Sequence, residues 1–255
     1  MVKLSEIASG VKDTELLYWF DSYLRTFNAT ILKVNCEGKR NVYVVLDRTV
    51  FHPKSGGQPS DTGMLSSDDF SIQIRKIMKF QNIIIHWGKI LEGMPDTKNI
   101  IGEIDWDSRY LYMKRHTAGH LLDHCLSVKL GRHVKTTDSW LGDSCYVGYE
   151  GKAPKENILL EAQQMENQII QTGAEVNIQI VSHDELIKKA PEAPNIYRLP
   201  QLENYRIVTI EGCDPIPCGG CHIKNVTEIG SFNILGVTST ENSFKVYYDV
   251  KSKII

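Results

Sequence analysis

Two short segments, far apart in the chain, carry the side chains best suited to chemistry. They are His116-Thr-Ala-Gly-His120 and Cys218-Gly-Gly-Cys-His222, which together offer three imidazoles and a thiolate. A helix brings positions i and i+4 onto one face, so His116 and His120 can point at a single ion, and Cys218 and His222 repeat the spacing. Nitrogen and thiolate donors in this ratio suit Zn²⁺ better than the hard, oxygen-preferring cations. The four residues therefore predict one zinc site with a net positive charge, an electrophile.

Other assignments of these residues stay open on pattern alone. His124 would make an equally good i, i+4 pair with His120. Cys213, Cys218 and Cys221 could build a structural zinc knuckle, and Cys218 with Cys221 has the CxxC form of a redox pair. The first segment lacks the glutamate of the HExxH metalloproteases, which counts against a peptidase.

A third segment is rich in glycine: Phe51-His-Pro-Lys-Ser-Gly-Gly-Gln-Pro-Ser-Asp-Thr-Gly63. Adjacent glycines at Gly56 and Gly57 let the backbone approach a ligand and turn its N–H groups toward an anion or a carbonyl. Gln58 and Asp61 add fixed polar groups. These four residues are candidates for the catalytic machinery, although such a loop is usually only a surface connection.

The elements that must position these segments fall into two parts. Residues 12–27 show a helical apolar stripe and predict an amphipathic helix. Short runs rich in branched and aromatic residues follow, which suits a small barrel or curled sheet; they begin at Thr30, Asn41, Phe70, Asn82 and Ile100. We place a domain boundary after residue 92, which gives an N-terminal β-barrel domain at 1–92 and a second domain at 93–255.

The second part mixes helices and strands without regular alternation. Asp107 or Ser108 can cap a helix that runs through the two histidines to about Lys129, and another helix is expected from Pro154 to about Gln171. Strands are expected again near Val176, Arg206, Ile229 and Phe244. This segregation predicts an α+β fold rather than a doubly wound sheet.

Composition limits the classes of protein. The 255 residues are 42% hydrophobic and 24% charged, which is ordinary for a globular protein. No segment is apolar enough for a membrane span, and the N-terminal residues lack the apolar core of a secretory signal, so we expect a cytoplasmic protein with its six cysteines reduced. The net charge of −2 gives no global attraction to nucleic acid, so any RNA contact needs a local basic patch.

The three motifs, in this order, resemble those of the AlaX family, the free-standing relatives of the editing domain of alanyl-tRNA synthetase. The resemblance covers nearly the whole chain and rests on FHPKSGGQPSDTG, on the HxxxH of MKRHTAGHLL and on the CxxxH of CGGCH. The loop-bearing N-terminal part is similar to the medium-length, two-domain type. Two positions depart from the usual synthetase pattern: Gly119 replaces a threonine of HTATH, and Cys221 replaces the threonine of CGGTH.

The resemblance implies a fold and an activity. The fold would be a small N-terminal β-barrel followed by an α+β editing core, and the activity would be hydrolysis of serine, with glycine as a second candidate, from wrongly charged tRNA(Ala). The zinc ligands would be His116, His120, Cys218 and His222. Thr136 and Thr137 match a family stretch that lines the amino-acid pocket.

Specificity and RNA binding need further residues. Serine is larger than alanine, so alanine cannot be excluded by size, and a buried group that hydrogen-bonds the serine hydroxyl must discriminate. Arg109, Lys114 and Arg115 precede the ligand pair and could face the tRNA acceptor end. The main alternative function is a non-catalytic, zinc-stabilised RNA-binding module; a zinc hydrolase of another small ester or amide is a third. The sequence leaves the oligomeric state open.

Overall fold

The computed structural model describes residues 3–95 and 99–251 and divides into two compact units. The first comprises Met1–Ser55 and Pro59–Tyr110, and the second comprises Gly56–Gln58 and Leu111–Ile255. The glycine-rich loop thus contributes three residues to the unit that also holds both histidine segments.

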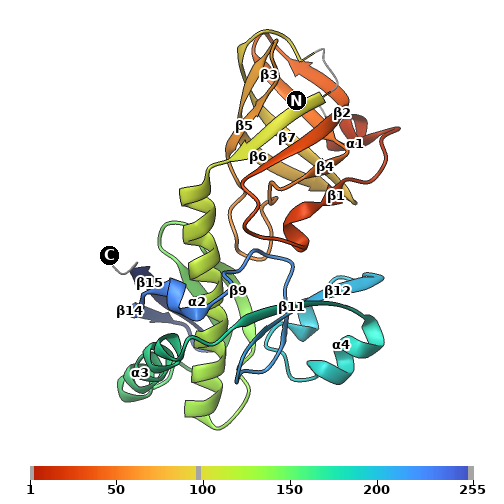
Figure 1. The fold of residues 1–255 in the computed structure, drawn as a ribbon. Coiled ribbons are helices and arrows are strands. Elements are labelled where there is room, and N and C mark those ends of the chain that lie inside the picture. Colours follow the sequence, from red (N-terminus) through yellow and green to blue (C-terminus); the bar gives the residue numbers. More distant parts are fainter. Residues whose placement is uncertain (1–2, 96–98, 252–255) are drawn as a thin grey trace. The chain divides into compact units, whose positions relative to one another are not determined.

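The first unit is a closed six-stranded barrel (Figure 1), which confirms the expected N-terminal β-barrel. Its strands are joined in the order β2-β3-β7-β6-β5-β8, with antiparallel neighbours. They are β2 (Thr26–Glu37), β3 (Asn41–Leu46), β5 (Gly63–Ser66), β6 (Ser71–Phe80), β7 (Ile83–Glu92) and β8 (Asn99–Ile104). Five of the six coincide with the strand-like runs; β5, with four residues, is too short to show an alternating pattern.

The barrel interior explains why these runs form strands. Side chains alternate along β8, so that Ile100 and Ile104 are buried while Ile101 between them is 54% exposed. The inward residues join Val44, Leu65 and other buried aliphatic side chains in one core. Closure leaves no open sheet edge among these six strands.

The helix expected over residues 12–27 is wrong. This segment contains β1 (Glu15–Leu16), which pairs with β4 (Arg48–Thr49), and a short 3₁₀ helix, η1 (Leu17–Trp19). The backbone N–H of Glu15 donates to Asp47 O, and the Thr14 hydroxyl donates to Leu46 O. Pairing with a strand 33 residues further along the chain therefore overrides the local helical pattern, and Phe20 of the apolar stripe is 69% exposed. A short helix, α1 (Leu4–Ala8), precedes it.

The division between the units differs from the one expected after residue 92. Residues of β8 pair with both β2 and β5, so the barrel cannot close without Asn99–Ile104. The first unit accordingly continues to Tyr110, inside the helix α2 (Trp106–Leu130).

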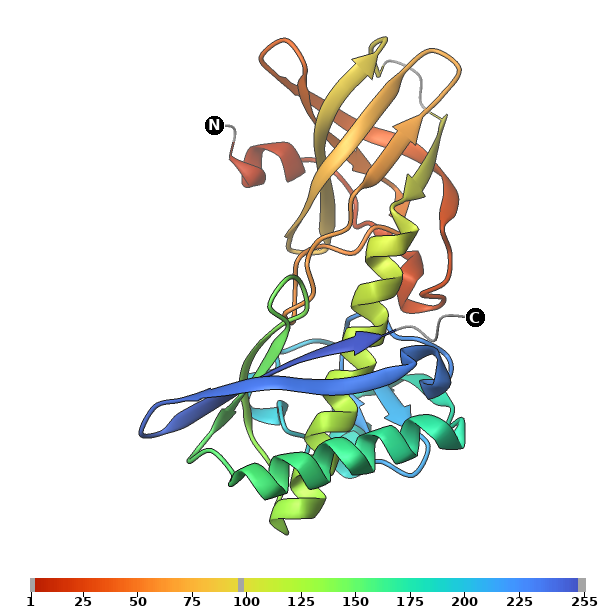
Figure 2. The same ribbon diagram turned by 90° about the vertical axis from the view of Figure 1, so that its left-hand side faces the viewer.

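The second unit is built on a four-stranded antiparallel sheet in the order β14-β15-β10-β9. The strands are β9 (Thr136–Trp140), β10 (Tyr146–Glu150), β14 (Ser231–Ser239) and β15 (Ser243–Lys251). Helix α2 is tied to this sheet, because Tyr248 of β15 donates a hydrogen bond to Arg115 O and Tyr149 of β10 donates one to Asp123 Oδ1, each 2.8 Å long. Helix α3 (Glu156–Thr172) runs alongside the β14–β15 ribbon (Figure 2).

A second sheet carries the cysteine segment. It has the order β11-β12-β13 and comprises β11 (Val176–Ser182), β12 (Asn204–Ile210) and β13 (Ile216–Pro217). Between β11 and β12 lie α4 (His183–Lys189), which begins with a capping box of Ser182 and Glu185, and the 3₁₀ helix η2 (Ile196–Arg198). A further 3₁₀ helix, η3 (Val226–Ile229), precedes β14.

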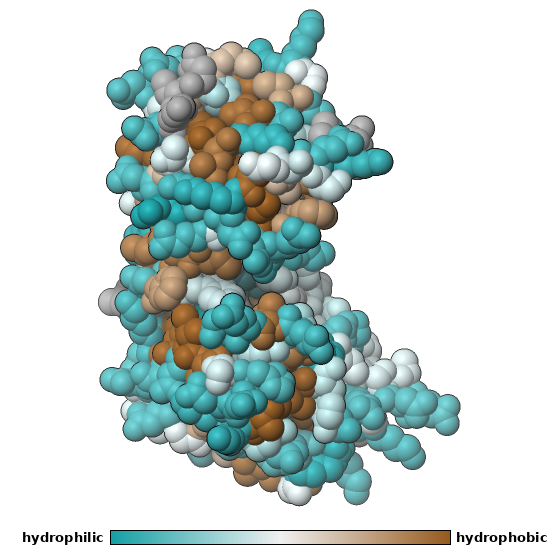
Figure 3. Space-filling model, turned by 90° about the vertical axis from the view of Figure 1, so that its right-hand side faces the viewer, coloured by the Kyte–Doolittle hydropathy of each residue, from teal (hydrophilic) through white to brown (hydrophobic). Residues whose placement is uncertain are grey.

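The α+β class is confirmed. The two long helices and the strands near Val176, Arg206, Ile229 and Phe244 were expected, whereas β9, β10 and α4 were not. No helix within the described residues has the length and apolarity needed to cross a membrane. On the face drawn in Figure 3, hydrophobic residues form small areas separated by hydrophilic ones.

Candidate metal centre

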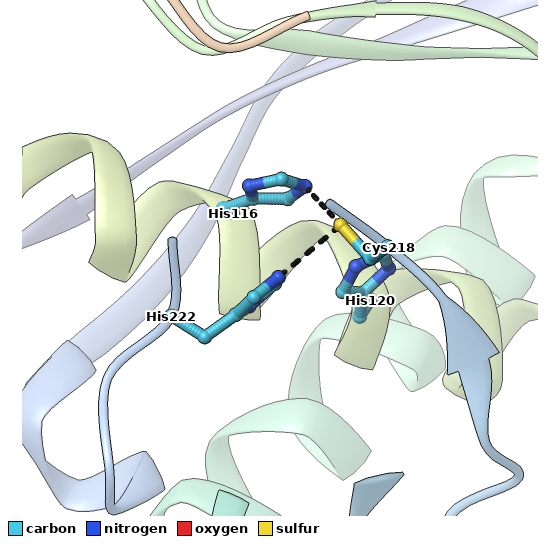
Figure 4. A group of neighbouring side chains, drawn as sticks. All are labelled: His116, His120, Cys218 and His222. Atoms are coloured by element: carbon cyan, nitrogen blue, oxygen red, sulfur yellow. Dashed lines mark hydrogen bonds between the residues drawn. The ribbon is translucent and has the colours of Figure 1, made fainter. Parts of the chain in front are cut away.

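The two histidine-bearing segments meet in the second unit. His116 and His120 lie one turn apart on α2, and Cys218 and His222 lie on the segment that follows β13. One donor atom from each of the four residues falls within 4.8 Å of the others. Cys218 Sγ lies 3.3 Å from His116 Nε2 and 3.4 Å from His222 Nε2 (Figure 4). This group could hold a metal ion, as the four residues predicted.

The other ring nitrogen of each histidine has a partner behind it. The Nδ1 atoms of the three rings lie 3.3 Å from Gln58 Oε1 (His116), 3.8 Å from Asp123 Oδ2 (His120) and 3.1 Å from Thr117 Oγ1 (His222). Outer partners of this kind fix the ring orientation and leave Nε2 as the metal donor. His120 Nε2 is buried and has no hydrogen-bond partner among residues 3–95 and 99–251. Donor types and orientation both fit a cation such as Zn²⁺.

The charges within the group also suit a cation. Burial raises the pKa of the Cys218 thiol, but His116 and His222 outweigh this effect and hold that pKa well below its usual value. Burial lowers the pKa of His222 well below its usual value, which favours a neutral imidazole. A thiolate and neutral imidazoles are the forms that bind metal. Burial opposes protonation of His120, but Asp123 and Cys218 raise its pKa to about 9, so a bound cation would displace that proton.

The segment that carries Cys218 is held by Arg206, a residue that sequence reasoning missed. Arg206 lies on β12 and is 3% exposed, and its Nη1 atom donates to Cys218 O and Gly220 O at 2.9 and 2.6 Å. A lone arginine within the apolar run Arg206-Ile-Val-Thr-Ile was the available sign of this role. Gly220 permits the close approach of the loop, because a Cβ there would lie 2.2 Å from His116 Cε1.

Gln58 of the glycine-rich loop reaches the centre, and the adjoining Gly56 and Gly57 contact strand β9. Gln58 is fully buried; its Oε1 atom accepts the Cys221 N–H at 3.0 Å, and its Nε2 atom has no hydrogen-bond partner among the described residues. Gly57 has φ +80°, and a Cβ there would lie 2.3 Å from Ser139 Oγ. Gly56 O accepts a hydrogen bond from the Ser139 hydroxyl. The loop therefore lies between the metal centre and strand β9.

Asp61, the fourth loop residue expected at the site, belongs to the barrel unit instead. It is 2% exposed, and its carboxylate accepts the His52 N–H and forms an ion pair with Arg109. Arg109 is fully buried and also donates to Val50 O at 2.6 Å and to Ser22 O at 3.3 Å. Arg109, which was expected to face RNA, is therefore buried in an ion pair, and the catalytic role of Asp61 stays a prediction.

Arg115 is also committed to the protein interior. Its side chain donates to Asp249 Oδ1 at 3.0 Å and to the carbonyl oxygens of Leu141 and Gly142 at 3.1 and 2.8 Å. The residue is 8% exposed, and the neighbouring Lys114 is 6% exposed. The expected contact of this basic run with the tRNA acceptor end is not supported, because burial removes these charges from the surface.

The two threonines expected in the amino-acid pocket lie at the start of β9. The Thr136 hydroxyl donates to Pro194 O and accepts from Arg198 Nη2. Thr137 is exposed, and its hydroxyl donates to Asp138 Oδ1 at 3.0 Å. Of the two, Thr137 has the hydroxyl less committed to the fold.

The alternative ligand sets find no support among the described residues. His124 and Cys213 lie outside the four-residue group. Burial raises the pKa of Cys213 to about 12, which opposes the thiolate form that a zinc knuckle needs. All six cysteines are free thiols, as expected. Cys221 is fully buried beside the centre, and Gly119 lies where a Cβ would come within 2.8 Å of Tyr248 Oη.

Comparison with known proteins extends over both units. Residues 11–108 match the family model described as tRNA synthetases class II (A). Residues 205–246, which include the Cys218–His222 segment, match the threonyl and alanyl tRNA synthetase second additional domain.

Individual relatives match most of the chain. It is 33% identical to the alanyl-tRNA editing protein AlaX-M of Methanosarcina barkeri over 92% of this chain and 98% of that protein. Identity to AlaX-M of Methanosarcina mazei is 36% over 87% of this chain and 90% of the relative. The alanine–tRNA ligase of Ignicoccus hospitalis is 29% identical over 94% of this chain, which corresponds to 26% of the ligase. Because relatives that are 33% and 36% identical match along most of both chains, this chain, with its barrel and its histidine–cysteine centre, belongs to the AlaX family of alanyl-tRNA editing proteins.

Proposed function

We propose that this protein is a trans-editing hydrolase that cleaves the aminoacyl ester of tRNA(Ala) wrongly charged with serine or with glycine, using one zinc ion. The observation that carries the proposal is the contact of Gln58 with the candidate metal centre within one unit. The centre is formed by His116, His120, Cys218 and His222. The names of the AlaX-M relatives support alanyl-tRNA editing as the reaction. We place the reaction in the cytoplasm, where charged tRNA is used.

The chain's own residues would bind and orient the ester. Through Oε1, Gln58 fixes His116 and the Cys221 backbone, so its Nε2 group remains as a donor for the acyl end of the substrate. The backbone N–H groups of Gly56 and Gly57 would serve as further donors to the oxyanion that develops at the ester carbonyl. A zinc ion held by His116, His120, Cys218 and His222 would supply Lewis-acid chemistry, either on an oxygen of the substrate or on water.

The release of labelled serine and labelled alanine from the two charged forms of tRNA(Ala) tests this proposal. The enzyme as purified should release serine quickly, the chelated enzyme should release it slowly, and return of zinc should restore fast release. Alanine should stay attached in all three cases. Glycine release from Gly-tRNA(Ala) is measured in parallel. Equal release of serine and alanine would contradict editing.

The competing function is a non-catalytic RNA-binding module in which the metal only stabilises the fold. The variant Cys218→Ala separates the two, because loss of a structural metal unfolds its domain, whereas loss of a catalytic one leaves a folded, inactive protein. Binding of tRNA without any ester cleavage by folded, zinc-loaded protein would favour the module.

Discrimination against alanine is proposed to depend on Thr137. Its hydroxyl, which the bound substrate would cover, is held by Asp138, while the Thr136 hydroxyl is already bonded to Pro194 and Arg198. In Thr137→Val, the ratio of kcat/KM for Ser-tRNA(Ala) to that for Ala-tRNA(Ala) should fall about tenfold, since one hydrogen bond to the serine hydroxyl is lost. Thr136→Val is the matched variant on the same strand, and an unchanged ratio in Thr137→Val would exclude this residue.

A further inference from the structure

Tyr197 stands out on the surface of the second unit. It is 79% exposed, although it lies in the middle of η2 (Ile196–Arg198), whose other apolar side chain is packed. Ile196 and Leu199 on either side of it join the core that contains Val181 and Tyr205. Ile196 and Leu199 therefore fix the segment to the core, while the Tyr197 ring faces solvent.

Two cations accompany this ring. Lys135 Nζ lies 5.3 Å from the centroid of the Tyr197 ring, within the range of a cation–π contact. Arg198, the next residue, donates from Nη1 to Thr137 O and from Nη2 to Thr136 Oγ1, each at 2.6 Å. The result is an aromatic surface with fixed positive charge beside it, in a chain whose net charge is −2.

The same segment is hydrogen-bonded to strand β9 and to the residue that precedes Cys218. Pro194 O accepts the Thr136 N–H at the start of β9, and Asn195 Nδ2 donates to Pro217 O, one residue before Cys218. Strand β9 begins at Thr136 and includes Ser139, whose hydroxyl donates to Gly56 O. Three residues of strand span about 10 Å. The distance along β9 from this segment to the glycine-rich loop is thus on the scale of a nucleotide or two.

We propose that Tyr197 is a stacking platform for an unpaired base at the 3′ end of the charged tRNA, with Lys135 pairing with the adjoining phosphate. This inference rests on the proposed editing function. Bases of any kind stack on an exposed aromatic ring, and nearby lysine or arginine side chains track the phosphates, which is how proteins hold single-stranded RNA. The platform would hold the RNA end while the ester reaches the centre.

Steady-state kinetics test the platform. Stacking of one base corresponds to a factor of about 5 to 150 in binding, so Tyr197→Ala should lower kcat/KM for Ser-tRNA(Ala) by about tenfold, mainly through KM. Tyr197→Phe should retain the wild-type value, because stacking does not need the hydroxyl. Leu235→Ala, which removes another exposed apolar side chain (67%) from the same unit, is the control and should have no effect. An unchanged kcat/KM in Tyr197→Ala overturns the inference.

A binding measurement without ester cleavage keeps this inference separate from the proposed function. In Tyr197→Trp, the trinucleotide CCA should quench the fluorescence of the added tryptophan. In Phe20→Trp, at a 69% exposed position that follows η1 in the first unit, it should not. If CCA quenches the fluorescence of Tyr197→Trp but the protein never releases serine, the result supports base stacking on Tyr197 and contradicts the editing function. Normal editing without quenching would keep editing and reject the platform.

The salt dependence of binding tests the role of Lys135. Each phosphate contact on single-stranded RNA contributes about 0.7 to the slope of log affinity against log salt concentration. Lys135→Gln should therefore reduce the slope for CCA binding by about this amount, and the exposed Lys152→Gln in the same unit should not. Equal slopes in wild type and Lys135→Gln would remove the phosphate contact from the inference.

Discussion

Asp123 connects the metal centre to the core beneath it at the level of single residues. It is 5% exposed; one carboxylate oxygen lies 3.8 Å from His120 Nδ1, and the other accepts the Tyr149 hydroxyl at 2.8 Å. Glu166 is fully buried nearby, with no hydrogen-bond partner for either oxygen among the described residues. Burial first, and then the charge of Asp123, raise the pKa of Glu166 well above its usual value. The shift favours the neutral form of Glu166, which carries no second negative charge.

Asp123→Asn should weaken zinc binding by about 10- to 100-fold, the usual loss when the outer partner of a metal-bound histidine is changed. The amide retains the shape of the side chain but not the negative charge that orients His120. Competition with a chromophoric chelator measures the affinity. Asp143→Asn, at an exposed position in the same unit, is the control. Equal affinity in Asp123→Asn and wild type would show that the 3.8 Å contact has no role in metal binding.

His86 is a buried histidine without a place in the site. It lies on β7, where Nδ1 faces Val44 O at 3.2 Å and Nε2 faces the Thr49 hydroxyl at 2.9 Å. Burial lowers its pKa from 6.5 to about 4, although the hydrogen bond to Val44 opposes this shift. The folded barrel therefore holds a neutral imidazole at a pH where the unfolded chain is already protonated.

This shift predicts acid sensitivity of the barrel. Because the unfolded chain binds the proton more tightly, the free energy of unfolding falls as the pH drops from 6.5 toward 4, by up to about 3 kcal/mol, and the full contribution is present above pH 6.5. His86→Gln should flatten this dependence, as measured by urea unfolding followed by tryptophan fluorescence at pH 7 and at about pH 5. His183→Gln, with a side chain 62% exposed, should retain it. The same steep dependence in His86→Gln would contradict the assignment.

Helix α2 is the element that positions the centre. Its buried face includes Ala118, Leu121, Leu122 and Cys125, so packing on the sheet fixes the direction of His116 and His120. Gly119 allows this close approach, because a Cβ there would lie 2.8 Å from Tyr248 Oη and 3.4 Å from Val147 Cγ2. Tyr248 cannot easily move, since its hydroxyl is buried and donates to Arg115 O.

Gly119→Ala should therefore destabilise the second unit in spite of the better helix propensity of alanine. The gain in propensity is about 1 kcal/mol, whereas overpacking a core contact costs about 1–3 kcal/mol. Adding Tyr248→Phe removes the contacted oxygen. The loss of stability in the double variant should therefore be smaller than the sum of the losses in the two single variants. Thermal unfolding of the four proteins measures this coupling, and strict additivity would refute the steric explanation.

At the scale of the whole molecule, the four proposed ligands all lie in one of the two units. Metal removal should therefore lower the stability of the second unit and leave the barrel unchanged, because a ligand stabilises only the cooperative unit that binds it. Hydrogen exchange with and without chelator should show faster exchange in α2 near His116 and around Cys218, with strands β3 and β7 unaffected. Equal acceleration in the barrel strands would show that the two units unfold together.

Local sequence patterns predicted much of this architecture. Helix α3 has a clear apolar stripe, helix α2 has a long run of helix-compatible residues that ends before Gly131, and most strands are runs of branched residues, so these elements were found. The structure of segment 12–27 was not predicted correctly. Its helical stripe competes with backbone pairing to Arg48–Thr49, and no local pattern reveals that pairing. The short strands β9 and β10 carry the polar residues Thr136–Ser139 and a glycine, and so lack the usual strand composition.

The sequence alone predicted the proposed ligand set, the resemblance to the AlaX family and the fold class. The first depends on residue types and i, i+4 spacing, the second on three motifs in order, and all of these are local properties of the chain. Only the tertiary structure separated Gln58, buried beside His116, from Asp61, which pairs with Arg109 in the other unit, although the two lie three positions apart. It also assigned Asp123, Thr117 and Arg206 to the support of the ligands and withdrew Arg115 from the surface. The physical reason is that burial of a polar group depends on partners far away in sequence, and only packing brings those partners together.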